Sequence, residues 1–343
     1  MKRIKLILLS LGCLLFLVGG PSLSKVYATE GQVWYSVQAI LPENQKDPNV
    51  SYFDLQVVPG QQQELQVEIF NHENTELTVE VTPTVSSTNR NGLVVYEEQE
   101  AMDDSLMHPL PDLMEMESNT ITVPAAETEV ITLRLTAPEK SFDGVILGGL
   151  HFEKVPDEDT ESSSEGVSIE NRYAYVIGVQ LSQTDEVIEP ELNLKAIEPS
   201  LVNYRTAVIA QIQNPQPLLM GGVHISAQVF EAEGTGPIKE STMEDVSFAP
   251  NSTMDYVINW DNQYLEPGDY RLEMTAVDGE ETWEWSEPFT ITEEASLLSE
   301  DAVELEEEPF DPTILYVIIG VLIVIIIGLV IYVLKKGKSH EKK

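Results

Sequence analysis

Few residues of this sequence stand at spacings that support catalysis. The stretch HENTE, residues 72–76, begins like the zinc-protease motif H-E-x-x-H, but Glu76 stands where the second histidine ligand belongs. Nucleophile-elbow, phosphate-loop and dinucleotide-binding motifs do not occur, and Gly234 and Gly236 alone are typical of a turn. Acidic pairs are too frequent for one to be identified as a glycosidase acid/base pair. We therefore predict no enzyme, no catalytic residue and no cofactor.

The acidic, serine-rich stretch PDEDTESSSEG, which begins at Pro156, is the strongest candidate for a cation. It lacks the Asp and Gly spacing of an EF-hand loop, so we predict no metal site, although weak and unspecific calcium binding stays open. The stretch is also too polar to bury an apolar face. Residues 156–168 therefore form either a loop within a first domain or the linker between two domains.

Two tryptophans stand on the same face of an expected strand in TWEWSEPFTIT. Trp283 and Trp285 would suit a platform on which a carbohydrate stacks. The alternative is a ridge of core side chains, and Phe289 and Ile291 favour it because they continue the same alternation.

The stretch SFDGVILGGLHFE, residues 141–153, carries two adjacent glycines inside an expected strand. Glycine weakens a strand unless a bulge, another chain or a ligand comes close to it. A binding role and a packing role both remain open here. The candidate binding residues are Phe142, Asp143, Gly144, Gly148, Gly149 and His151.

The elements that must position these residues are strands. Apolar residues recur at every second position, as in Leu65-Val67-Ile69, which is the period of a strand with one buried face. Turn signals at 58–62, 89–92, 137–144, 249–252 and 266–269 separate them. Seven strands are expected after residue 190, at 191–197, 206–213, 222–231, 238–247, 253–260, 269–277 and 283–291. We predict an all-β ectodomain of two immunoglobulin-like β-sandwiches in tandem, at 32–184 and 187–293.

The two ends of the sequence predict export and a membrane anchor. Residues 1–28 have the basic start, apolar stretch and compact cleavage residues of a signal peptide cut after Ala28. An acidic stalk is expected at 294–312, and residues 313–334, which carry no charge, suffice for a transmembrane α-helix of about 33 Å. The basic tail at 335–343 marks the cytoplasmic side. The prediction is a single-pass type I protein of the cell membrane whose ectodomain faces the wall.

Composition restricts the compartment and the partners. Cys13 is the only cysteine and lies in the predicted signal peptide, so the mature protein has no disulfide, which is ordinary for exported Gram-positive proteins. The formal net charge of −39 repels phosphate polymers and argues against nucleic-acid binding. The same charge favours basic partners, although it also simply keeps an exposed protein soluble.

The extended patterns carry a family resemblance. YSVQAILPENQ, YFDLQVVPGQQQELQVEIFN and ITVPAAETEVITLRLTAPEKSFDGVILGGLHF resemble the first domain of the WxL-interacting proteins of Gram-positive bacteria. NPQPLLMGGVHISAQVF, SFAPNSTMDYVINWDNQYLEPGDYRLEMTA and WEWSEPFTIT resemble their second domain. The resemblance covers nearly all of the predicted ectodomain.

This resemblance implies a surface protein with three kinds of partner. Its first domain would bind peptidoglycan, its second would bind host extracellular components, and the protein would form complexes with WxL-domain surface proteins. No tryptophan is followed two positions later by leucine, so this chain would be the partner of a WxL protein. A chaperone-like or assembly role, in which the sandwiches hold exported chains by strand addition, is the alternative.

Overall fold

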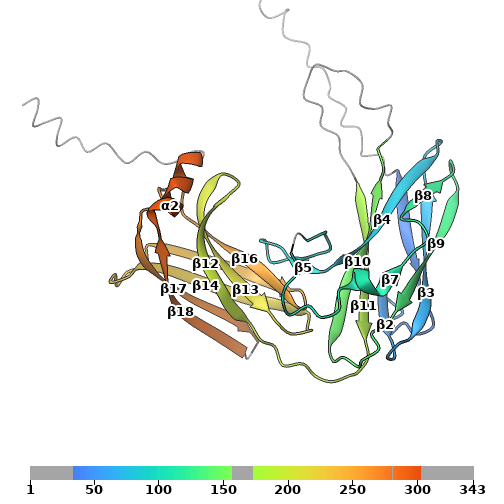
Figure 1. Ribbon diagram of the computed structural model, residues 1–343, viewed down its shortest axis with the longest axis horizontal. Coiled ribbons are helices and arrows are strands. Elements are labelled where there is room, and N and C mark those ends of the chain that lie inside the picture. Colours follow the sequence, from blue (N-terminus) through green and yellow to red (C-terminus); the bar gives the residue numbers. More distant parts are fainter. Residues whose placement is uncertain (1–33, 100, 157–172, 280, 303–343) are drawn as a thin grey trace, which may run out of the picture.

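The computed structural model describes residues 34–99, 101–156, 173–279 and 281–302. These residues form two β-rich units that lie side by side along the long axis of the molecule (Figure 1). We call residues 34–182 the N-terminal unit and residues 192–302 the C-terminal unit. Each has its own hydrophobic core.

The N-terminal unit packs two sheets around one core. The first sheet has the order β1-β3-β9-β7, and its strands are Tyr35–Ile40, Gln62–Asn71, Thr128–Thr136 and Met114–Glu115. The second has the order β2-β11-β10-β4-β8, with strands Phe53–Gln56, Ala174–Ser182, Val145–Lys154, Leu77–Val85 and Thr120–Val123. Inward residues such as Phe53, Leu133 and Phe152 are fully buried between them. The alternation of buried and exposed residues in β3 and β9 is therefore the result of this two-layer packing.

A hydrogen bond inside this core ties one sheet to the other. The Tyr35 hydroxyl, on β1, donates to the Phe152 carbonyl on β10 at 2.9 Å. Burial raises the pKa of Tyr35 far above its ordinary value, so the hydroxyl stays protonated as a donor.

The C-terminal unit is also two sheets around a core. One sheet has the order β12-β13-β16, with strands Asn193–Val202, Arg205–Asn214 and Ser252–Asn259. The other has the order β15-β14-β17-β18, with strands Lys239–Phe248, Met220–Glu231, Gly268–Asp278 and Glu281–Ile291. These seven strands coincide closely with the seven expected from the sequence.

Helices are short throughout the described residues. A 3-10 turn, η1, spans Leu110–Leu113, and α2 (Glu293–Ser296) runs into η3 (Leu297–Asp301) at the start of the predicted stalk. Ala295 and Leu298 pack against the C-terminal core. Among residues 34–302, apart from the gaps, no helix has the length and apolar character needed to span a bilayer.

The predicted fold class, two immunoglobulin-like sandwiches in tandem followed by one transmembrane α-helix, is wrong as stated. The described chain is all-β but divides into five sheets, and β2 joins β11 in parallel. The fifth sheet is the separate hairpin β5 (Ser87–Thr88) and β6 (Val94–Val95). Apolar alternation shows which face of a strand is buried but not which strand it pairs with. The predicted span 313–334, the signal peptide and the cytoplasmic tail lie outside the described residues.

Candidate ligand-binding cleft

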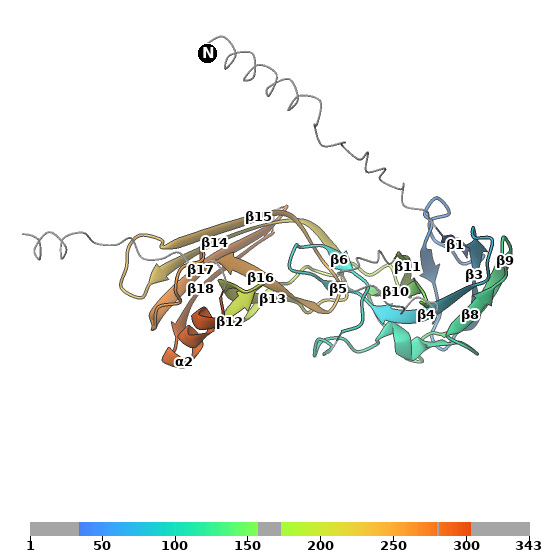
Figure 2. The same ribbon diagram turned by 90° about the horizontal axis from the view of Figure 1, so that it is seen from above.

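A segment of the N-terminal unit reaches across to the C-terminal unit. This bridging segment, residues 86–99 and 101–106, contains the β5–β6 hairpin, which lies between the two units in both views (Figures 1 and 2). The Thr88 hydroxyl lies 3.1 Å from that of Ser252 and accepts the Ala249 N–H at 2.8 Å, and all three groups are buried. The Gly92 carbonyl accepts the Ser247 N–H at 2.8 Å. Backbone and side chains of the two units thus share hydrogen bonds.

The turn at Asp103 makes the second contact between the units. Its carboxylate accepts hydrogen bonds from the Thr253 hydroxyl at 2.5 Å and from the Gln213 amide at 2.7 Å, both on the C-terminal unit. The Ser105 hydroxyl and N–H bind the same carboxylate from within the turn. Burial alone would raise the pKa of Asp103, but these hydrogen bonds outweigh burial and hold that pKa below its ordinary value. Asp103 is therefore an ionised group that fixes the two units together.

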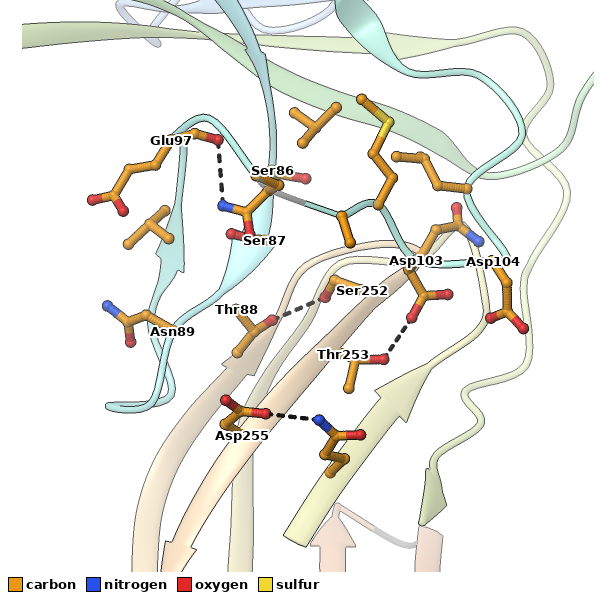
Figure 3. Close-up of a pocket in the computed structure, with 18 of the residues that line it drawn as sticks. Ser86, Ser87, Thr88, Asn89, Glu97, Asp103, Asp104, Ser252, Thr253 and Asp255 are labelled. Atoms are coloured by element: carbon orange, nitrogen blue, oxygen red, sulfur yellow. Dashed lines mark hydrogen bonds between the residues drawn. The ribbon is translucent and has the colours of Figure 1, made fainter. Parts of the chain in front are cut away.

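A cleft of about 850 Å³ lies between the bridging segment and the sheet β12-β13-β16. Ser87 and Asn89 line it from the hairpin, and Gln211, Thr253 and Asp255 line it from the strands. Figure 3 shows the polar groups of both sides facing this space. Most of the lining groups are hydroxyls, amides and carboxylates, which suit a polar ligand rich in hydrogen-bonding groups.

Two ion pairs cross between the units at the rim of the cleft. Arg90 of the bridging segment lies 3.4 Å from Asp255, and Lys195 of β12 lies 3.6 Å from Asp104. Because these side chains are partly or largely exposed, each pair contributes at most about 1 kcal/mol. The rim therefore carries opposite charges that are paired only weakly.

The predicted glycines lie in the middle of a sheet and do not line the cleft. Gly148 and Gly149 are on β10, which pairs with β4 on one side and β11 on the other. A Cβ on Gly148 would collide with the Leu110 side chain, and one on Gly149 would lie 3.0 Å from Tyr96. His151 is half-buried on the same strand. The glycines thus leave room for neighbouring side chains, and both backbone edges of β10 are occupied.

The other predicted residues lie near the junction of the units. Phe142 is half-buried against the N-terminal core, and Asp143 accepts a hydrogen bond from the Thr184 hydroxyl at 2.7 Å. Gly144 has a φ of +76°, and a Cβ there would collide with the Pro217 carbonyl of the C-terminal unit. None of the six predicted residues lines the cleft. Their binding role stays a prediction.

The sequence reading missed the residues that build the cleft. Thr88, Asp103 and Thr253 are polar and lie at turns or strand ends, where polar residues are ordinary. The sequence does contain one indication of a functional segment here. Residues 96–119 carry no strand-like alternation, although they stand between two expected strands. A long irregular segment within a compact protein is frequently functional.

The tryptophan pair belongs to the core. Trp283 and Trp285 are partly buried and pack against the C-terminal core from β18. Neither lines the cleft. Within the described ranges, no group of three or more His, Cys, Asp or Glu side chains is placed to hold a metal ion.

Two family models match the sequence. Residues 35–154 match the peptidoglycan binding domain of the WxL Interacting Protein family, and residues 164–298 match its host binding domain. No curated protein matches the chain significantly. The boundary between the two matches precedes β11, although β11 pairs within the sheet of the N-terminal unit.

Several solved structures resemble the chain distantly. A chaperone–tip adhesin complex of CFA/I fimbriae biogenesis is 10% identical, with 75% of this chain and 97% of that chain covered and a TM-score of 0.30. The YadV chaperone is 12% identical, with 75% and 100% covered and a TM-score of 0.29. A PapD-like domain of human CEP192 is 10% identical, with 49% and 100% covered and a TM-score of 0.27. These TM-scores are too low to support an argument about function.

Proposed function

Since this chain belongs to the WxL-interacting protein family, we propose that it is a non-catalytic surface protein of a Gram-positive bacterium that binds peptidoglycan through the cleft at residues 86–106. The observation that carries the proposal is the position of the bridging segment. It lies inside the 35–154 match to the peptidoglycan binding domain and forms one wall of the cleft.

The chemistry of the cleft agrees with a glycan ligand. Sugar rings present hydroxyls, and N-acetyl groups present an amide donor and acceptor, so a glycan needs both donors and acceptors from the protein. The cleft offers hydroxyls from Ser87 and Thr253, an amide from Asn89, and carboxylates from Glu97 and Asp255. Ser87 is half-buried on β5 and lines the cleft.

The proposal includes two protein partners. The C-terminal unit, most of which lies in the 164–298 match, would bind a host extracellular component, and a WxL-domain surface protein would join the complex. The contacts between the two units support a common scaffold, because Thr88 and Asp103 fix one unit against the other. The cleft is complete only when both units are in place.

The test is co-sedimentation of the full chain with isolated peptidoglycan sacculi. Ser87→Trp would obstruct part of the cleft, and Asn91→Trp, at the exposed tip of the same hairpin, is the matched control. We expect Ser87→Trp to weaken sedimentation by about tenfold or more, since loss of one or two polar contacts costs about 1–3 kcal/mol. Asn91→Trp should sediment like the wild type. Thermal unfolding of both variants checks that they fold.

Two results would overturn parts of the proposal. If the wild-type protein stays in the supernatant, the chain does not bind peptidoglycan by itself. If it sediments and Ser87→Trp sediments equally well, the glycan binds elsewhere. Gel filtration with a purified WxL-domain protein tests the partner separately, and the absence of a complex at tens of micromolar contradicts that part.

A further inference from the structure

Strand β9 has an outer edge that no described strand covers between Glu129 and Leu133. On its inner side β9 pairs with β3 along its whole length. On its outer side it pairs only with β7, through Met114 and Glu115. After β7 the chain moves away from the edge of β9 and crosses to the other sheet, where it forms β8. The edge faces a space that a further strand would fill by continuing the line of β7.

Two hydrogen bonds at the ends of β9 show which of its backbone N–H and C=O groups point toward β3 and which point outward. The Ala137 N–H and the Glu127 carbonyl both bond to the chain at the ends of β3, at 2.8 and 3.0 Å. Successive residues of an antiparallel strand direct their N–H and C=O groups to opposite sides. The backbone N–H and C=O groups of the odd-numbered residues of β9 therefore point toward β3. Those of the even-numbered residues Val130 and Thr132 point outward. These groups are the donors and acceptors that an added strand requires.

A groove of about 710 Å³ runs along this edge, between β9 and residues 115–121. Met116 and Ile121 form an apolar part of its wall and are half-buried against the N-terminal core. Val130 is 48% exposed, which is unusual for a valine on a strand. Both views place β8 and β9 at the end of the molecule remote from the C-terminal unit (Figures 1 and 2). The groove is therefore separate from the cleft.

The charge of the groove selects the kind of partner. Four carboxylates line it, from Glu64, Glu115, Glu117 and Glu129, against the single cation of Arg134. An acidic strand would be repelled there, and a basic strand attracted. A second copy of this chain is a poor occupant because its own net charge is −39.

We propose that the β9 groove binds an extended basic segment of a partner protein by strand addition. The main chain of the partner would bond to Val130 and Thr132, in continuation of β7. Alternate side chains of the partner would be apolar where they face Met116 and Ile121, and basic where they face the carboxylates. The ligand must be a polypeptide, since only a polypeptide backbone repeats N–H and C=O groups at this spacing.

The test uses a nine-residue peptide, acetylated and amidated at its ends, in which lysine alternates with valine. Fluorescence anisotropy measures its binding to the full chain. Thr132→Pro removes one outward N–H and leaves the bonds to β3 intact, and proline is tolerated on a strand edge in this orientation. We expect this variant to bind the peptide about tenfold more weakly, as for the loss of one hydrogen bond.

Thr122→Pro on β8 is the matched control. The Asn119 carbonyl bonds to the Val81 N–H of β4 at 2.7 Å, so the N–H of Thr122 faces away from β4 and is equally dispensable. Thr122 does not line the groove. This variant should bind the peptide like the wild type. Both proline variants should sediment with sacculi like the wild type, which separates this proposal from the function of the cleft.

A second measurement needs no altered protein. The same peptide with N-methyl groups on alternate residues keeps its charge but loses the donors on one edge, so it should bind the wild-type chain at least about tenfold more weakly. Strand addition is refuted if both peptides bind equally, or if Thr132→Pro binds the peptide like Thr122→Pro. In either case the attraction between the peptide and the groove is merely electrostatic. Absence of any binding, or dimerisation through β9 in gel filtration, also overturns the proposal.

Discussion

Asn71 and Asn214 end corresponding strands of the two units and make the same set of hydrogen bonds. Each side-chain amide donates to the carbonyl four residues ahead, at 2.9 and 2.8 Å. Each side-chain oxygen accepts the N–H two residues ahead, at 2.8 and 3.1 Å. Each amide also donates to a carbonyl distant in sequence, that of Val123 for Asn71 and that of Ala249 for Asn214. Both buried asparagines therefore replace backbone pairing where the chain leaves a sheet.

Asn71→Ala should destabilise the protein. The change removes the amide that donates to the Val123 carbonyl in a buried bond and to the Pro124 carbonyl in a part-buried one, and we expect the free energy of unfolding to fall by about 1–3 kcal/mol. Asn119→Ala is the control, because Asn119 is exposed and bonds only at the surface. Denaturant unfolding compares the two. Equal effects of both changes would show that the buried network contributes little.

The bond between Thr88 and Ser252 should couple the stability of the two units. Thr88→Val keeps the shape of the side chain but leaves the Ala249 N–H without its acceptor, at a cost of about 1–3 kcal/mol. When Thr88→Val is combined with Ser252→Ala, the loss in the free energy of unfolding should be smaller than the sum of the two single losses by about 0.5 kcal/mol or more. Unfolding of the four proteins of this cycle measures the difference. Strict additivity would mean that the two hydroxyls act independently.

The contact at Asp103 should weaken in acid. Its folded-state pKa lies below the ordinary value of 3.8, so ionised Asp103 stabilises the folded protein above that pH. The stabilisation is lost as the pH falls below 3.8 through the folded-state pKa. We expect the difference in thermal stability between wild type and Asp103→Asn to shrink in that range.

The neighbouring Asp104 supplies the control for this pH profile. Its side chain is 79% exposed, pairs at the surface with Lys195 and accepts the Gln213 amide at 2.9 Å. Asp104→Asn keeps an oxygen that can accept the Gln213 amide and removes only the exposed pair with Lys195, so we expect a stability profile close to that of the wild type. A profile for Asp103→Asn that runs parallel to the wild type down to strong acid would contradict the role given to Asp103.

Lys239 should stabilise the loop that follows β16. Its ammonium group is almost fully buried and donates to the Trp260 carbonyl, Asp261 and Gln263 at 3.2, 2.7 and 2.8 Å. Lys239→Met keeps the volume but removes these donors, which should cost about 1–3 kcal/mol. Lys195→Met, at a more exposed site, should cost much less. Thermal unfolding compares the two variants. A Lys239→Met variant as stable as the wild type would refute this role of Lys239.

The sequence predicted the strands better than their arrangement. Runs such as 206–213 and 269–277 were placed within a few residues of β13 and β17, because apolar alternation directly records burial on one face. The parallel β2–β11 pair and the β5–β6 hairpin were missed, because register and pairing depend on contacts far apart in sequence.

The candidate site was harder to predict for a related physical reason. Gly148 and Gly149 were considered because glycine is unexpected in a strand, and the structure shows neighbouring side chains in the space above them. Thr88 and Asp103 gave no such signal, since each is ordinary until Ser252 and Thr253 are brought against it from more than a hundred residues away. The proposed domain limits and the binding role of Phe142 to His151 stay predictions.

The bridging segment has a mechanical consequence. If one unit is held by the wall while the other is pulled, the load passes first through the contacts at Thr88, Gly92 and Asp103 and the Val145–Pro217 backbone bond, and not through the connecting chain. Only residues 183–192 connect β11 to β12, so rupture of those contacts would lengthen the molecule by less than about 36 Å before a sheet must unravel. The protein would then yield in one short step under tension and resist further extension.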